Sequence, residues 1–132
     1  MNAFIIEMEN RPGEVARVAA AIGEKGINIT NAAGIAVATG GGLGMITNDE
    51  AGTRSALDQL GCTYREVEVF TINLEDRPGT LADATRRLAG AGVNIEFLAP
   101  AGMSGGQMTV AFGVDDVAKA RSALGQLATA MA

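Results

Sequence analysis

The sequence predicts an α+β protein made of two tandem copies of one small unit, and two repeated motifs carry this prediction. Residues 9–13 read ENRPG and residues 75–79 read EDRPG, while residues 26–29 read GINI and residues 92–95 read GVNI. Both motifs return after the same interval, since 75 − 9 and 92 − 26 are each 66. That interval is half of the 132 residues, so the whole chain reads as one unit repeated.

Each copy is predicted to begin with a strand and to continue with a helix. At the start of the second copy, Phe70, Ile72 and Leu74 alternate with Thr71 and Asn73, the period of two that is typical of a half-buried strand. The helix after each Arg-Pro-Gly has apolar residues at helical spacing, and a glycine ends it. The apolar helical positions are Val15, Val18, Ala19 and Ile22 in the first copy and Leu81, Ala84 and Leu88 in the second.

Two further strands and a second helix complete the predicted pattern of each copy. Glycine clusters predict the turn between the two strands, and an aspartate predicts the cap of the second helix. The last helix has an apolar stripe that reaches Leu127 and Met131. The expected positions are strands near 27–37, 43–48, 93–101 and 107–114, turns at 40–42 and 105–106, and caps at Asp49 and Asp115.

The two copies, residues 1–66 and 67–132, are predicted to be two domains that differ at their ends. Residues 63–67 read TYREV, a fourth strand that runs almost directly into the second copy, whereas residues 128–132 read ATAMA and favour a helix. In this prediction the second copy lacks its last strand, so solvent, the first copy or another chain must cover the strand edge. We expect a homodimer for this reason.

Composition and charge place the chain among globular proteins and argue against several partners. A hydrophobic fraction of 48% and a net charge of −5 differ from the composition of disordered chains. The acidic excess, without a Lys/Arg run, argues against nucleic acid and against an anionic membrane surface. No apolar stretch approaches the roughly 20 residues of a membrane span, and the N-terminus does not resemble a signal peptide. We expect a cytoplasmic protein.

The residues that most enzymes and metal sites need are scarce. The chain has no histidine, the commonest general acid or base and a common zinc ligand. Its one cysteine, Cys62, cannot form an internal disulfide, which fits a reducing compartment. The glycine run at residues 40–44 lies between two predicted strands, so it is not a dinucleotide-binding motif. We therefore expect no catalytic residues, no metal and no cofactor.

The first repeated motif allows a structural and a functional interpretation. In the structural one, it is a strand-to-helix turn in which Asn10 or Asp76 caps the helix and the glycine adopts an unusual backbone angle. In the functional one, the free N–H groups of the helix N-terminus hold a carboxylate, since Gly13 and Gly79 carry no side chain.

The second motif places an asparagine at the same point of both copies. Asparagine is a poor strand residue, so its presence at Asn28 and Asn94 needs a reason. Either the amide hydrogen-bonds the turn backbone locally, or it offers its donors and acceptors to a ligand.

The combination of strand, Asx-Arg-Pro-Gly, helix and Gly-[Ile/Val]-Asn-Ile resembles the ACT domain, a small-molecule-sensing regulatory module of amino-acid metabolism. The resemblance covers essentially the whole chain, twice, and is greatest to tandem ACT proteins without an attached catalytic domain. It implies ferredoxin-like βαββαβ units, with helices on one face of an antiparallel sheet. It also implies that an amino acid binds at the junction between two units, between the turn of one and the second strand of its neighbour.

The resemblance singles out candidate ligand-binding residues in both copies. Met8 and Leu74 stand where serine-sensing members carry a histidine, which favours a more apolar ligand side chain. Glu96 could meet a ligand ammonium group or could lie on an exposed strand face. The candidates are Asn10, Arg11, Gly13 and Asn28 in the first copy, and Asp76, Arg77, Gly79, Asn94 and Glu96 in the second.

The resemblance and the composition together predict a non-enzymatic regulatory or sensor protein that binds an amino acid between two units. Ligand occupancy would change the orientation of the units or their oligomeric state. Two alternatives are a separate regulatory subunit that docks on an amino-acid biosynthetic enzyme and a structural assembly module with a vestigial pocket. An enzyme of the same fold is not expected, because the usual catalytic residues are missing.

Overall fold

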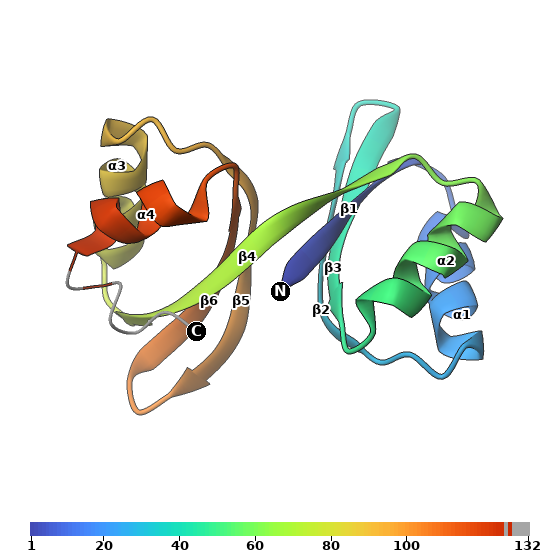
Figure 1. Cartoon of the computed structure of the whole chain (residues 1–132), viewed down its shortest axis with the longest axis horizontal. Coiled ribbons are helices and arrows are strands. Elements are labelled where there is room, and N and C mark those ends of the chain that lie inside the picture. The colour runs from blue at the N-terminus through green and yellow to red at the C-terminus, as the bar shows by residue number, and fades with distance from the viewer. Residues whose placement is uncertain (126, 128–132) are drawn as a thin grey trace. The chain divides into compact units, whose positions relative to one another are not determined.

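The computed structural model describes residues 1–125 and 127, which form two compact units (Figure 1). The N-terminal unit is Asn2–Glu66, and the C-terminal unit contains Met1 and the chain from Val67 onward. In each unit, two helices lie on one face of an antiparallel sheet (Figure 1). This is the ferredoxin-like arrangement that the sequence predicts.

The N-terminal unit has the complete βαββαβ order. Its sheet is ordered β2-β3-β1, and β4 begins beside β1, where the Glu7 N–H donates to the Thr63 carbonyl over 2.9 Å. The predicted fourth strand of the first copy is therefore confirmed, as the first part of a longer strand. The elements are β1 (Asn2–Glu9), α1 (Glu14–Glu24), β2 (Ile29–Val37), β3 (Gly40–Thr47), α2 (Glu50–Leu60) and β4 (Tyr64–Glu75).

The C-terminal unit repeats this order from the second part of β4. It continues with α3 (Thr80–Gly90), β5 (Ile95–Ser104), β6 (Gln107–Val114) and α4 (Val117–Leu124), and its strands are ordered β4-β6-β5. Within the described residues no strand follows α4. The predicted helix at 128–132, including Met131, falls outside those residues. The described helices have 11 residues or fewer, and none could span a membrane.

Each unit has its own apolar core between helices and sheet, and both cores contain the alternating strand residues that the sequence predicts. The helix stripe is wrong at its first position, because Val15 and Leu81 are 54% and 43% exposed. The buried core residues are Phe4, Ile6, Val18, Ile22, Ile27, Leu43, Met45, Ala56 and Leu57 in the N-terminal unit, and Phe70, Ile72, Leu74, Ala84, Leu88, Val93, Val110, Phe112, Val114, Ala120 and Leu124 in the C-terminal unit.

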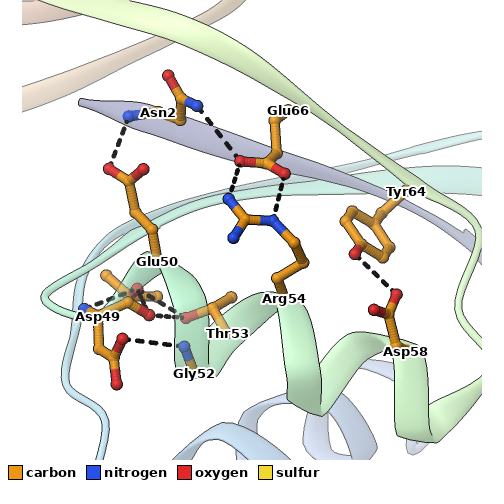
Figure 2. A network of polar contacts seen from close by, with 10 residues as sticks. Asn2, Asp49, Glu50, Gly52, Thr53, Arg54, Asp58, Tyr64 and Glu66 are labelled. Atoms are coloured by element: carbon orange, nitrogen blue, oxygen red, sulfur yellow. Dashed lines mark hydrogen bonds and ion pairs between the residues drawn. The ribbon is translucent and has the colours of Figure 1, made fainter.

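A polar network in the N-terminal unit joins β1, α2 and the beginning of β4 (Figure 2). Arg54 of α2 donates to both carboxylate oxygens of Glu66, over 2.8 Å from Nε and 2.7 Å from Nη2. Asn2 donates from its backbone N–H to Glu50 over 3.0 Å and from its amide to Glu66 over 3.3 Å. These contacts hold the beginnings of both strands against α2.

The glycine cluster of the first copy is not the turn that the sequence predicts. Residues 40–42 belong to β3, where they pair with β1 on one side and β2 on the other. The turn consists of Ala38 and Thr39, and Ala38 has a φ of 54°. In the second copy the prediction is confirmed, since residues 105–106 form the turn between β5 and β6. The repeat interval becomes 67 before this turn, because β5 has one more residue than β2, at a register shift between Pro100 and Gly102.

The change of interval explains a wrong helix cap. Asp49 caps α2 as predicted, because its carboxylate accepts from the Gly52 N–H over 2.9 Å. In the second copy the cap is Asp116, which accepts from the Lys119 N–H over 2.9 Å, and not Asp115. The extra residue of β5 shifts every later position by one, so Asp116 is the counterpart of Asp49.

Candidate functional site

The turn that connects the lead strand to the first helix depends on glycine in both units. Gly13 and Gly79 each have a φ of 92° and occupy the N-cap position of their helix. No side chain caps either helix, so the prediction that Asn10 and Asp76 act as caps is wrong. Glycine is needed because a side chain is strained at this backbone angle.

Asn10 and Asp76 instead attach the turn to the neighbouring hairpin. The Asn10 N–H donates to the Thr39 carbonyl over 3.0 Å, and its amide donates to the Ala38 carbonyl over 3.4 Å. The Asp76 N–H donates to the Gly106 carbonyl over 2.9 Å. An ionised aspartate has no side-chain donor, so the amide contact cannot be repeated there.

A nearly buried carboxylate lies beneath the turn of the N-terminal unit. Glu14, the first residue of α1, is 6% exposed, and it accepts from Arg11 Nε over 2.9 Å and from Arg17 Nε over 3.2 Å. Arg11 also pairs with Glu9 over 3.0 Å. Burial raises the pKa of Glu14, but the hydrogen bonds and charges of the two arginines outweigh it, and the net pKa is lowered. Charges of both signs therefore meet at this turn.

The turn of the C-terminal unit has a different set of contacts. Thr80 stands where the first unit has Glu14, and its hydroxyl donates to the Glu75 carbonyl over 2.8 Å. Arg77 pairs with the exposed Glu75 carboxylate over 2.6 Å. This hydrogen bond and charge raise the pKa of Arg77. The second turn thus lacks the nearly buried carboxylate of the first.

A cavity of about 290 Å³ opens beside the turn of the N-terminal unit. Its floor is formed by β2 and β3, where Gly34, Ala36 and Gly41 offer little or no side chain. Asn10, Arg11 and Glu14 bring polar groups to the same cavity. The complete lining is Met8, Glu9, Asn10, Arg11, Glu14, Val15, Gly34, Ile35, Ala36, Gly40, Gly41 and Gly42.

The corresponding cavity of the C-terminal unit is about 150 Å³. Met108 pairs with Leu74 there, as Gly41 pairs with Met8 in the first unit, so a long side chain replaces a glycine. A further hollow of about 310 Å³ lies on another side of Arg77 and Thr80. The smaller cavity is lined by Leu74, Glu75, Asp76, Arg77, Gly79, Thr80, Leu81, Met108 and Val110.

The repeated strand asparagines are held through their backbones. The Asn28 N–H donates to the Asn48 side chain over 2.9 Å, and the Asn48 N–H donates to the Asn28 carbonyl over 3.1 Å. Asn94 and Asp115 form the same pair, over 3.0 and 3.3 Å. The side chains of Asn28 and Asn94 are exposed. The four hydrogen bonds above use only the backbone groups of these two asparagines, so the predicted bond from the side-chain amide to the turn backbone is not among them. Their amides therefore face solvent.

Within one unit, the turn and the strand asparagine lie at opposite ends of the first helix. An α-helix of 11 residues is roughly 16 Å long, so Asn10 and Asn28 do not share a site inside their own unit. Asn94 instead lines an open hollow of about 540 Å³ with Arg86 and the outer side of α3. Glu96 lies farther along β5 and is half-buried.

Three residues at the site were not predicted. Glu14 could have been found as an acidic residue at the first helical position, where the second copy has threonine. Asn48 and Asp115 are equivalent positions of the two copies, but they are 67 residues apart, so a comparison at the interval of 66 does not align them. Gly34 gives no sequence signal of its own. Among residues 1–125 and 127, no three His, Cys, Asp or Glu side chains are placed to hold a metal ion.

A comparison with protein families matches residues 1–127 to a family model described as an ACT domain pair. No curated protein matches the chain. Among solved structures, a Bacteroides thetaiotaomicron protein is similar at 22% identity and a TM-score of 0.75, over 95% of this chain and 86% of that one. The regulatory subunit of aspartate kinase from Thermus thermophilus is similar at 20% identity and a TM-score of 0.68, over 98% of this chain and 91% of that one.

Proposed function

The chain belongs to the family of ACT domain pairs, and on that premise we propose that it is a non-catalytic regulatory protein that binds an amino acid. The observation that carries this proposal is the cavity of about 290 Å³ beside the first turn, where Arg11 and Glu14 present charges of both signs. A free amino acid carries the same two charges. The volume is just below the roughly 300–1,000 Å³ of typical ligand pockets, which suits a single small molecule.

We infer that a complete site needs two units, with residues 1–66 and 67–132 as the domains. The turn residues Asn10, Arg11 and Gly13 would hold one end of the ligand, and the exposed amide of Asn28 or Asn94 in a neighbouring unit would hold the other. The separation of about 16 Å along the first helix supports this inference, because one unit cannot supply both groups. The corresponding second-copy residues are Asp76, Arg77, Gly79, Asn94 and Glu96.

A homodimer in the cytoplasm is the setting that we propose. Two chains would provide additional turns and strand asparagines, and ligand bound between units would favour the assembled form. Light scattering at micromolar concentration, with and without amino acid, tests this part. A monomer under both conditions would contradict it.

Thermal unfolding in the presence of each of the twenty amino acids tests the proposed function. A ligand at ~100-fold excess over its dissociation constant stabilises the folded state by about 2.7 kcal/mol. The site is then examined with Asn28→Ala and Asn94→Ala, since loss of a hydrogen bond to a charged group costs roughly 1.5–3 kcal/mol. Gly13→Val and Gly79→Val are unsuitable, because their φ of 92° makes any side chain strained. If no amino acid stabilises the protein, the proposed function is wrong.

A second candidate function is that of a regulatory subunit for a separate amino-acid biosynthetic enzyme. It is favoured by the similarity to the Thermus thermophilus subunit over nearly the full length of both chains. Affinity purification of the full chain from its own cells distinguishes the two. A biosynthetic enzyme recovered in stoichiometric amount, and released by mild salt, supports the subunit role.

A further inference from the structure

Gly34 is a glycine that its own surroundings do not require. It lies within strand β2, and a Cβ placed on it would be 3.6 Å from Leu43 Cδ1 and 3.8 Å from the Gly42 carbonyl, which are ordinary contacts. Its φ is not in the left-handed region. A glycine inside a strand weakens the strand, and it often marks a bulge, a tight bend or the close approach of another backbone or a ligand. The register of β2 with β3 is regular at Gly34, so no bulge explains this glycine.

Gly41, which pairs with Ala36 on the cavity floor, has a different reason to be glycine. A Cβ there would lie 2.5 Å from the Ile35 carbonyl oxygen, so the close approach of β2 and β3 excludes any side chain. The sheet explains Gly41 without a ligand. Of these two glycines, only Gly34 could be replaced by a residue with a side chain without a clash in the fold. Its lack of a side chain leaves open space beside the N-terminus of α1.

The chemistry of the cavity separates into an apolar part and a charged part. Met8, Val15 and Ala36 contribute apolar surface, and Val15 is 54% exposed. Arg11 uses Nε and Nη1 in its contacts with Glu14 and Glu9, so three of its five N–H groups take no part in those contacts. Such a site matches a zwitterionic head and an uncharged, apolar side chain.

The equivalent cavity in the C-terminal unit is smaller. Pro100 pairs with Val110 as Gly34 pairs with Leu43, and Met108 pairs with Leu74 as Gly41 pairs with Met8. Met108 packs partly buried against the core and lines the remaining cavity of about 150 Å³. The second turn also carries an aspartate, Asp76, where the first has a neutral asparagine. The second cavity is therefore smaller and less suited to a ligand carboxylate.

We propose that the Gly34 cavity receives the aliphatic side chain of the bound amino acid, and that Met108 closes its counterpart, so that one ligand binds per chain. This inference rests on the proposed function and specifies its ligand class. Arg11 would meet the ligand carboxylate, and Glu14 would meet its ammonium group. The strand amide of a neighbouring unit would complete the contacts with the charged end of the ligand. The open space beside Gly34 would select valine or leucine over glycine and alanine.

Isothermal titration of the full chain with glycine, alanine, valine, leucine and serine tests the inference. We expect valine or leucine to bind most tightly, with one molecule per chain. Gly34→Val places a branched side chain in the cavity and should weaken that binding at least tenfold, because a single methylene in a hydrophobic pocket changes selectivity by about 10- to 200-fold. Gly34→Ala should show a smaller loss in the same direction.

Two measurements separate a filled pocket from a damaged fold. Valine and alanine suit a strand better than glycine, so both Gly34 variants should unfold at a higher temperature than the parent when no ligand is present. Gly23→Ala on α1 serves as the matched control, since a Cβ there meets nothing within 4 Å. It should also raise the unfolding temperature, while affinity for the ligand stays unchanged.

The outcomes distinguish this inference from the proposed function. If serine or another polar amino acid binds and no aliphatic one does, the inference is wrong and the proposed function stands. Unchanged affinity of Gly34→Val for valine and leucine, or two ligands per chain, would likewise overturn it. If none of the twenty amino acids binds, the proposed function fails and takes the inference with it.

Discussion

The two units have the same elements, but their buried residues differ where the third strand packs against the second helix. In the N-terminal unit, the buried hydroxyls of Thr47 and Thr53 are 2.7 Å apart, and both contact the Asp49 carbonyl. In the C-terminal unit, Val114 and Ala120 fill the equivalent positions and belong to the apolar core. One polar and one apolar solution therefore support the same packing of helix on strand.

The contrast continues at the surface of the second helix. The network of Arg54, Glu66 and Asn2 (Figure 2) belongs to the N-terminal unit, and Glu50 takes part in it. The position equivalent to Glu50 is Val117, which packs against the C-terminal core. What the units share is strand alternation, glycine at the turns and an aspartate cap. The polar contacts are free to differ because each adds little to the shared apolar layer.

Substitutions in the shared apolar layer should lower the stability of the two units by similar amounts, and these should be the largest effects. Ile6 and Ile72 are equivalent and fully buried. We expect Ile6→Ala and Ile72→Ala each to lower the stability of its own unit by about 2–5 kcal/mol, through lost burial and the cavity left behind. Hydrogen exchange resolved along the chain measures each unit separately. A large loss in one variant with almost none in the other would break the equivalence of the two cores.

Transplanting the apolar pair of the C-terminal unit tests the difference between the interiors. Thr47→Val removes the acceptor of the Asp49 N–H, and Thr53→Ala removes the hydroxyl partner of Thr47. Each single change should cost about 1–2 kcal/mol, because it removes the bond between the two hydroxyls and the bond from the lost hydroxyl to the Asp49 carbonyl. The double variant, which copies Val114 and Ala120, should cost clearly less than the sum. Urea unfolding of the four proteins forms the cycle, and simple additivity would show that the threonines do not act as a pair.

The aspartate caps of α2 and α4 should contribute equally to the stability of their helices. Asp49→Ala and Asp116→Ala each remove a carboxylate that accepts from the helix backbone, and each should cost about 1 kcal/mol. Asp115→Ala serves as the control, since it removes the contact with the Asn94 N–H and leaves α4 capped. Helix-resolved hydrogen exchange should show faster exchange in the first turn of α4 for Asp116→Ala only. The opposite result would restore Asp115 as the cap.

Acid should affect the two units unequally, with the smallest effect of the four. The pKa of Glu66 is lowered by its hydrogen bond from Arg54, and that of Glu14 is lowered by Arg17 and Arg11 despite burial. A carboxyl group whose pKa is lowered in the folded state stabilises the fold at pH values above its ordinary pKa of 4.5. This stabilisation is lost as the pH falls through the pKa of the folded state. The turn of the C-terminal unit has Thr80 in place of Glu14, and threonine does not titrate.

The measurement is hydrogen exchange between about pH 6 and about pH 3, corrected for intrinsic rates. The N-terminal unit should lose more protection than the C-terminal unit below pH 4.5. In Glu14→Gln this difference between the units should become smaller. Equal losses in both units of the parent protein would contradict the assignment.

The fold was predictable from the sequence because the repeat doubles every signal. Strand alternation, helix stops at Gly26 and Gly92, and the order of elements all agree between the copies, and the structure has them. The errors arise where the copies diverge by one residue. The glycines at 40–42 suggest a turn, but the turn is Ala38 and Thr39, and the shift of interval moves the second cap to Asp116.

The candidate site was predictable only as a set of motif residues. Asn10, Arg11, Asp76, Arg77 and Gly79 do line cavities at the two turns. The size of those cavities depends on contacts across strands, such as Gly41 with Met8, that no local pattern reports. A single glycine in a strand also does not show, from the sequence alone, that it leaves open space in the wall of a cavity.

The strand β4 gives the protein a property that matters for its dissection. Its 12 residues, Tyr64–Glu75, begin in the N-terminal unit and end in the C-terminal one, so the boundary after Glu66 lies inside a continuous strand. A protease that requires an unfolded connecting segment should find none at this boundary, and limited digestion should not release two halves. Anyone who expresses one half alone must truncate a strand that the other half uses. Fragments that overlap through residues 64–75 are the better choice for complementation experiments.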